Sequence, residues 1–230
     1  MALPEQLEAV FIDVGGPIYP DETFVDAVTH ALDDIRAEQG QPPADRQQVR
    51  AVYDRIRREQ NGSFRTALAT EVLGDKVLRG ELHARTEPYW RHPAGSMYRD
   101  VLPLLRTLHG RVRVGVLANQ EASVIEALRR DGLGELIDVW GVSAVVGHEK
   151  PSRELFDWSL AEAGTSADRA VHIGNRLDND VRPAKALGLS TVWVLRGDAP
   201  DAPTAQQRAE ADLVVDNLDG LADRLLGARQ

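Results

Sequence analysis

The spacing of hydrophobic positions changes twice along this chain and divides it into three stretches. The first stretch contains a short apolar run, Ala9–Ile12, which is followed at once by Asp13 and then by a Gly-Gly-Pro turn. An uninterrupted apolar run that ends at glycine and proline is typical of a central strand in a parallel sheet. We therefore expect a buried strand that ends at Asp13.

The second stretch has helical spacing from residue 23 to about residue 82. Phe24, Val28 and Leu32 recur at intervals of four residues, and Asp45 stands where it can cap the next helix. Two more helices are expected over residues 64–73 and about 75–89. Because no strand pattern occurs here, we predict a helical insertion, residues 20–93, between the first two strands of a sheet.

In the third stretch short strands alternate with helices. Strands are predicted at 112–117, 137–142, 170–173, 191–195 and 213–215, and helices at 98–108, 123–130, 152–163, 181–187 and 218–226. Such alternation indicates a parallel sheet with right-handed crossovers. We therefore predict an α/β fold, a doubly wound parallel sheet formed by residues 1–19 and 94–230.

Polar residues follow or lie near several of these predicted strands. Asp13 follows the first, Asn119 the second, and Asn175 and Asp180 follow the strand at 170–173, while Lys150 precedes a helix. Each of them alone is common in a capping or turn position. Open α/β sheets, however, bind ligands outside the carboxyl ends of their strands, so we expect these side chains to meet at one edge.

Composition excludes some classes of partner. The chain of 230 residues carries a net charge of −9, which argues against nucleic acid or an anionic membrane as a partner. It contains no cysteine, so disulfides and thiolate chemistry are excluded. No apolar run approaches the roughly 18 residues that span a bilayer, and the first residues do not resemble a secretion signal. We expect a cytoplasmic protein that acts on a small molecule.

Taken together, residues 13–18 (Asp-Val-Gly-Gly-Pro-Ile), 147–151 (Gly-His-Glu-Lys-Pro) and 174–180 (Gly-Asn-Arg-Leu-Asp-Asn-Asp) resemble the haloacid dehalogenase (HAD) superfamily. The resemblance covers essentially the whole chain and implies a Rossmann-like core with a helical cap of the C1 type. It also implies phosphoryl transfer through a covalent intermediate, a reaction that depends mainly on positioning and charge neutralisation.

The resemblance assigns roles to individual residues. Asp13 would attack phosphorus and form an aspartyl-phosphate, and Lys150 would hold the Asp13 carboxylate and neutralise charge. A Mg²⁺ ion would be bound by Asp13, the carbonyl of Gly15, Asn175 and Asp180. The groups expected to contact phosphate or substrate are Gly15, Gly16, Ala118, Asn119 and, from the cap, Arg65.

Three positions depart from the family pattern. Gly15 stands where the family's phosphatases usually carry an aspartate that acts as general acid, Ala118 replaces a Ser or Thr that contacts phosphate, and Asn175 replaces the first acid of the metal turn. General acid catalysis is typically worth about 10²–10⁴-fold. We therefore expect weak Mg²⁺ binding, or none, and a slow or unusual hydrolase.

Three hypotheses follow. The first is a Mg²⁺-dependent phosphatase of a small phosphorylated metabolite. The second is a metal-independent 2-haloacid dehalogenase, although those enzymes usually carry an aromatic residue and a threonine where Gly15 and Pro17 stand. The third is a HAD-fold binding or regulatory protein that has lost catalysis, which Ala118 and Asn175 favour.

Overall fold

The computed structural model describes residues 3–227 of the chain. It divides into two compact units. The first, here called the core unit, contains the described residues up to Pro20 and those from Pro93 onward. The second, the helical unit, is Asp21–His92.

The core unit is built on a single parallel sheet of six strands in the order β3-β2-β1-β4-β5-β6. The strands are β1 (Ala9–Ile12), β2 (Arg113–Ala118), β3 (Val139–Val142), β4 (Ala170–Gly174), β5 (Ser190–Val194) and β6 (Leu213–Val215). Ile12 at the end of β1 lies beside Val116 of β2 and Ile173 of β4. The residues that follow these three strands therefore emerge at the same edge of the sheet.

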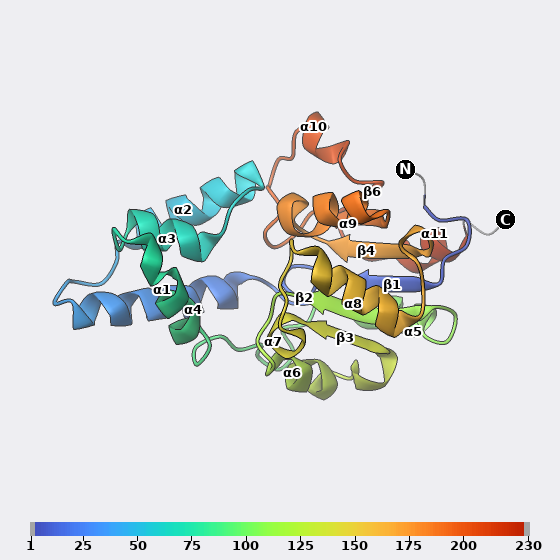
Figure 1. Ribbon diagram of the computed structural model, residues 1–230, viewed down its shortest axis with the longest axis horizontal. Coiled ribbons are helices and arrows are strands. Elements are labelled where there is room, and N and C mark those ends of the chain that lie inside the picture. Colours follow the sequence, from blue (N-terminus) through green and yellow to red (C-terminus); the bar gives the residue numbers. More distant parts are fainter. Residues whose placement is uncertain (1–2, 228–230) are drawn as a thin grey trace. The chain divides into compact units, whose positions relative to one another are not determined.

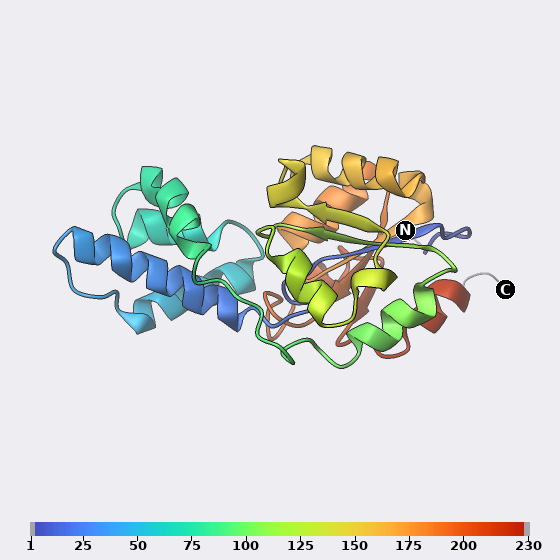
Figure 2. The same ribbon diagram turned by 90° about the horizontal axis from the view of Figure 1, so that it is seen from below.

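Side chains alternate between the two faces of the sheet, as the pleat of a strand requires. Val10 and Ile12 pack in a core formed with α5 (Val101–Leu108), α6 (Val124–Arg130) and α11 (Leu221–Gly227). Ala9 and Phe11 pack instead against α8 (Arg153–Ala163) and α9 (Arg182–Leu187). Figure 2 shows the two helix layers with the sheet between them. Both faces of β1 are thus buried, which explains its continuous apolar run.

Short helical turns complete the core unit. They are η2 (Gly134–Leu136), α7 (Ser143–Val146), η3 (Ala167–Arg169), η4 (Leu177–Val181, a single π-helical turn) and α10 (Ala205–Arg208). Of these, η4 matters most for function because it leads directly out of β4 at the edge where Asp13 lies.

The helical unit contains α1 (Glu22–Glu38), α2 (Arg46–Glu59), α3 (Phe64–Glu71), η1 (Lys76–Leu78) and α4 (Arg79–Thr86), drawn in blue to green in Figure 1. Val28, Leu32 and Leu68 belong to its own hydrophobic core. The Asp45 side chain caps α2 by accepting a hydrogen bond of 2.8 Å from the Gln47 backbone. The helix pattern in the sequence therefore located this helical stretch, although the bounds of its last elements differ.

The α/β class and the single parallel sheet are confirmed, but several boundaries differ from the prediction. The helix expected at 98–108 begins only at Val101, and the Asp100 side chain just before it binds Arg196 and the backbone of Leu218 instead of capping the helix. The helix expected at 75–89 is a 3₁₀ turn followed by α4. Two helices, α7 and α10, were not predicted because each has only four residues.

None of the helices within residues 3–227 combines the length and the apolar character needed to cross a membrane.

Candidate active site

Asp13 and Lys150 meet at the carboxyl edge of the sheet. The backbone N–H of Asp13 donates to the carbonyl of Ile173 at 2.8 Å, which fixes its backbone on β4. Its Oδ1 accepts from the N–H of Val14 at 2.8 Å and lies 3.0 Å from Nζ of Lys150. The two residues are 137 positions apart in the chain (150 minus 13). The structure thus brings the predicted nucleophile and the predicted lysine into direct contact.

Asn119 fixes the backbone of Lys150. Its Nδ2 donates to the Lys150 carbonyl at 2.8 Å, and its Oδ1 accepts from the Lys150 N–H at 2.7 Å. Asn119 follows β2, the neighbour of β1, so this pair of hydrogen bonds positions the lysine beside Asp13. Both polar atoms of the Asn119 side chain thus bind the backbone of Lys150, and the predicted contact of Asn119 with phosphate stays a prediction.

Asp180 holds the other side of the Lys150 ammonium. Its Oδ1 lies 2.6 Å from Nζ of Lys150 and 3.0 Å from Nε2 of His172. Its Oδ2 accepts from the backbone N–H groups of Asn175 at 3.1 Å and Arg176 at 2.9 Å. Both oxygens of this fully buried carboxylate are therefore occupied, and Asp180 could bind a metal only if some of these contacts opened.

His172 supports Asp180 from within the sheet. It lies on β4, is 1% exposed, and packs edge-on against Phe156. Burial lowers the pKa of His172 and outweighs the opposite effect of Asp180, so the imidazole is neutral. Since a carboxylate can only accept, Nε2 carries the proton and donates to Asp180.

The carboxylates of Asp13 and Asp180 both contact the Lys150 ammonium, and the pKa of Asp13 is raised while that of Asp180 is lowered. Burial raises the pKa of Asp13 to about 7, with the charge of Lys150 opposing the change and the charge of Asp180 adding to it. For Asp180, burial raises the pKa but Lys150 and His172 lower it further, so the net shift is downward. Burial lowers the pKa of Lys150, yet the two carboxylates raise it by more. The ammonium and the Asp180 carboxylate thus stay charged, and Asp13 is the group that titrates near neutral pH.

The loop after Asp13 is packed closely against the turn after β4. Gly16 has a φ of +83°, and a Cβ placed on it would lie 1.8 Å from Nδ2 of Asn175. Glycine is the residue that both the backbone conformation and the contact permit. Asn175 is 1% exposed, its Nδ2 donates to the Arg196 carbonyl at 3.3 Å, and its own carbonyl accepts from Nε1 of Trp193 at 2.9 Å.

The donor set offers Mg²⁺ a limited number of charged ligands. Among residues 3–227, the Asp13 carboxylate makes its closest approach to Lys150 and its hydrogen bond with Val14 through Oδ1, and this side chain is 16% exposed. In the same range, no three His, Asp or Glu side chains form a group that could hold a metal. One carboxylate with neutral oxygens nearby fits a Mg²⁺ ion that keeps several waters and completes its shell with a substrate phosphate. It does not fit a tight all-protein site.

Two predicted contact residues remain less defined. Ala118 ends β2 and is fully buried. Its side chain is a methyl group, which cannot form a hydrogen bond. Arg65 lies in the helical unit, where its guanidinium carbon is 4.9 Å from the ring centre of Phe24 and 5.7 Å from that of Trp90. Its role toward substrate stays a prediction.

Arg196 and Asp100 were not predicted from the sequence. Arg196 lies just beyond β5, and its guanidinium forms an ion pair of 2.8 Å with Asp100. The rule that led to Asp13 and Asn175, polar residues beyond the carboxyl end of a strand, also applies to Arg196. Asp100 carried no such signal, because an acid before a helix looks like an ordinary cap.

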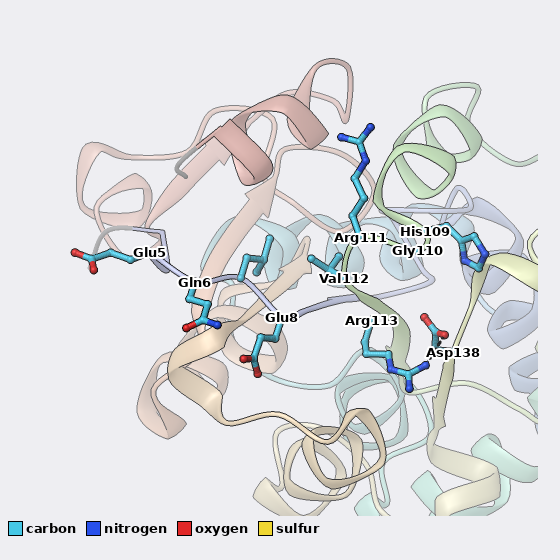
Figure 3. A pocket seen from close by; sticks show the side chains of 10 residues that line it. Glu5, Gln6, Glu8, His109, Gly110, Arg111, Val112, Arg113 and Asp138 are labelled. Atoms are coloured by element: carbon cyan, nitrogen blue, oxygen red, sulfur yellow. Dashed lines mark hydrogen bonds and ion pairs between the residues drawn. The ribbon is translucent and has the colours of Figure 1, made fainter. Parts of the chain in front are cut away.

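A surface hollow of about 650 Å³ lies at the opposite edge of the sheet. It is lined by residues that precede β1, by the loop that leads into β2, and by Asp138 before β3 (Figure 3). Two of its charged residues, Arg113 and Asp138, form an ion pair of 3.0 Å. Because the strands begin here, the hollow is separate from the edge where Asp13 lies.

Comparison with known proteins places the chain in a family. Residues 148–221 match the HAD-hydrolase-like family model. The chain is 30% identical over 163 residues to a ribulose-1,5-bisphosphate 5-phosphatase from Halopiger xanaduensis, a match that covers 67% of this chain and 68% of that protein. The protein belongs to the HAD superfamily of hydrolases. The resemblance seen in the sequence motifs is confirmed.

Other HAD relatives agree with this assignment. The chain is 34% identical over 98 residues to a glyceraldehyde 3-phosphate phosphatase from Methanocaldococcus jannaschii, covering 43% of this chain and only 42% of that protein. A solved structure of a predicted phosphatase from Clostridium acetobutylicum superposes with a TM-score of 0.73 at 16% identity and covers 96% of this chain and 99% of that one. This last likeness shows the HAD fold.

Proposed function

We propose that this protein is a phosphatase that hydrolyses a small phosphorylated metabolite through an aspartyl-phosphate on Asp13. The observation that carries the proposal is the placement of the Asp13 carboxylate: Oδ1 is the oxygen nearest to Nζ of Lys150 and accepts from Val14, and the side chain keeps 16% exposure at the sheet edge. A nucleophile needs one fixed oxygen for orientation and one available oxygen for attack.

The chemistry proceeds in two steps. In the first, Oδ2 of Asp13 forms a bond to phosphorus as the bond between phosphorus and the ester oxygen breaks, and the leaving oxygen takes a proton from solvent. In the second, water attacks the aspartyl-phosphate, which releases inorganic phosphate and restores the carboxylate. The Lys150 ammonium, which is kept charged by Asp180, offsets the negative charge on the transferring group.

Asp13, the Gly15 carbonyl and Asn175 would hold a Mg²⁺ ion, which supplies further charge neutralisation when bound. Asp180 is better assigned to holding Lys150, because all its polar contacts serve that lysine and the turn after β4. Gly15 has no proton to donate, so esters with good leaving groups should react fastest.

The class of substrate follows from the relatives. Their names describe phosphatases of glyceraldehyde 3-phosphate and ribulose 1,5-bisphosphate, which are small phosphorylated metabolites. A phosphatase of this kind agrees with the acidic charge of the chain, which disfavours nucleic acid as a partner.

Phosphate release from p-nitrophenyl phosphate and from a panel of sugar phosphates, with and without Mg²⁺, tests the proposal. Asp13→Asn should lower the turnover on the order of 10³-fold or more, because the nucleophile is lost. Asp157→Asn, which changes a surface acid paired with Arg153 on α8, is the matched control and should keep wild-type turnover. Equal turnover of Asp13→Asn and wild type would refute catalysis by Asp13.

The same variants separate the other hypotheses. Halide release from a 2-chloroacid that depends on Asp13, without phosphate release, would indicate a dehalogenase. Binding of a phosphorylated ligand without turnover, unaffected by Asp13→Asn, would indicate a binding or regulatory protein.

A further inference from the structure

Arg196 donates hydrogen bonds to the loop that follows Asp13. It lies beyond the carboxyl end of β5, and its side chain is only 12% exposed. Its Nε donates to the carbonyl of Gly16 at 3.1 Å, and its Nη2 donates to the carbonyl of Pro17. A single guanidinium thus binds two consecutive carbonyls of the loop.

The other side of the guanidinium is anchored to the rest of the core unit. Its Nη1 lies 3.0 and 2.8 Å from the two oxygens of Asp100, and the Tyr98 ring centre is 4.0 Å from the guanidinium carbon. Asp100 in turn accepts from the backbone N–H of Leu218 at 2.8 Å. A buried ion pair with these additional hydrogen bonds has a fixed geometry. Because Nε, Nη1 and Nη2 each bind a group of the core unit, Arg196 is held against the loop.

The loop itself needs such support. Its residues 15–17 are Gly-Gly-Pro, and glycine leaves the backbone with wide conformational freedom. Within the loop, the N–H of Gly16 donates to the Tyr19 carbonyl at 2.7 Å, and the N–H groups of Ile18 and Tyr19 donate to Val14 at 3.0 Å. The carbonyls of Gly16 and Pro17 point outward from this turn and are the atoms that Arg196 binds.

We propose that Arg196 is a positioning residue for phosphoryl transfer, which fixes the loop after the nucleophile through the carbonyls of Gly16 and Pro17. This inference rests on the proposed function, because the same loop carries the Gly15 carbonyl expected at the metal and the amides expected at the phosphate. Arg196 acts on a second side as well, since its own carbonyl accepts from Nδ2 of Asn175. It therefore connects the loop after β1 with the turn after β4.

Arginine suits this task better than lysine does. Its planar fork presents donors in fixed directions, so it can bind the carbonyls and the Asp100 carboxylate together. A lysine would keep the positive charge beside Asp100 but would present a single ammonium to all three acceptors. Comparing Arg196→Lys with Arg196→Met therefore distinguishes the effect of the loop contacts from that of the ion pair with Asp100.

Hydrogen–deuterium exchange measured peptide by peptide gives a readout that does not require activity. In Arg196→Met, amides within residues 14–19 should exchange about tenfold faster or more, while the amides of β2 and β4 keep their protection. A residue that only adds global stability would accelerate exchange throughout the core unit. Arg182→Met, which removes an exposed ion pair of 2.6 Å with Glu210, is the matched control and should leave residues 14–19 unchanged.

Kinetics with p-nitrophenyl phosphate supply the second readout. In Arg196→Met, kcat should fall about ten- to a hundredfold, the size expected from a small misplacement of reacting groups, with little change in KM. Arg196→Lys should keep a melting temperature close to wild type and show intermediate exchange and kcat. If Arg196→Met does not fold, Arg196→Lys takes its place in both measurements.

Two results would overturn the inference: wild-type exchange of residues 14–19 in the folded variant, or faster exchange of that loop with kcat equal to the Arg182→Met control. Absence of any phosphatase activity in the wild-type protein would instead refute the proposed function. In that case the exchange measurement alone decides whether Arg196 holds the loop.

Discussion

At Asp13 the protein places a partly buried carboxylate that is held through Oδ1 by Lys150 and Val14. Three residues around Lys150 create this state: Asn119 places the lysine, Asp180 keeps it charged, and His172 supports Asp180. This group carries one positive charge, on Lys150, and two carboxylates, Asp13 and Asp180. A bound phosphate dianion therefore needs a further cation to balance its charge. Two substitutions test how this limited charge affects the reaction.

Gly15→Asp should increase the turnover of alkyl phosphates. The backbone at Gly15 lies outside the left-handed region, so an aspartate can adopt its conformation, and it would supply the missing proton donor. We expect about tenfold or more for alkyl esters, within the range of general acid catalysis, and less for p-nitrophenyl phosphate. Gly15→Asn, which has the same size but no acidic proton, is the control. Equal rates for the two variants would show that no acid acts from this position.

Asn175→Asp should strengthen Mg²⁺ binding. It restores a carboxylate at a buried turn where the wild type has an amide, so calorimetry should give a dissociation constant about tenfold lower, an effect of about 1.4 kcal/mol. Without metal, the buried charge should lower the melting temperature. Asn217→Asp, at an exposed position of the same unit, is the control. An unchanged affinity for Mg²⁺ would exclude residue 175 as a ligand position.

At the scale of elements, the sequence predicted what depends on periodicity and on chain order. The alternation of strands and helices gave the sheet, and β1 was recognisable because both of its faces are buried. The meeting of Asp13 with Lys150 followed from strand ends sharing an edge. The features that were not predicted depend on contacts between segments that are distant in the chain. They are the hydrogen bonds of Asn119 with the backbone of Lys150 and those of Arg196 with a loop 180 positions away. No local pattern encodes such pairs.

The junction of β4 with η4 is an element-scale feature that a single methyl group would disturb. A Cβ on Gly174 would lie 2.3 Å from Cβ and Cγ of Asp180, so Gly174→Ala must displace Asp180 from Lys150 and His172. We expect a loss of about 1–3 kcal/mol in the free energy of unfolding, measured with urea, and a strong loss of activity. Gly80→Ala in α4, where no atom lies within 4 Å, should instead gain up to about 1 kcal/mol. Similar values for both variants would contradict the close contact.

For the whole molecule, the two carboxylates give opposite pH dependences of stability. The pKa of Asp13 is about 7 when folded, against about 3.9 in an unfolded chain, so the folded state retains a proton that the unfolded state has released. The free energy of unfolding should therefore fall as pH rises from about 4 to about 7. The lowered pKa of Asp180 stabilises the fold above about pH 4 and loses that effect in stronger acid.

Scanning calorimetry with a chelator present checks this expectation. The melting temperature of the wild type should decrease between pH 5 and pH 8, and Asp13→Asn should show a smaller decrease because its side chain does not ionise. Parallel curves for the two proteins would contradict the raised pKa of Asp13.

The contact between Gly16 and Asn175 has a consequence for evolution and engineering. A side chain of any size at position 16 needs the space that the carboxamide now fills, so position 16 can change only together with position 175. When codon 16 alone is randomised, the functional variants should include glycine at this position. When codons 16 and 175 are randomised together, further combinations of residues at the two positions can be tested. To add an acid to the turn after β4, Asn175 should therefore be changed first, with Gly16 kept.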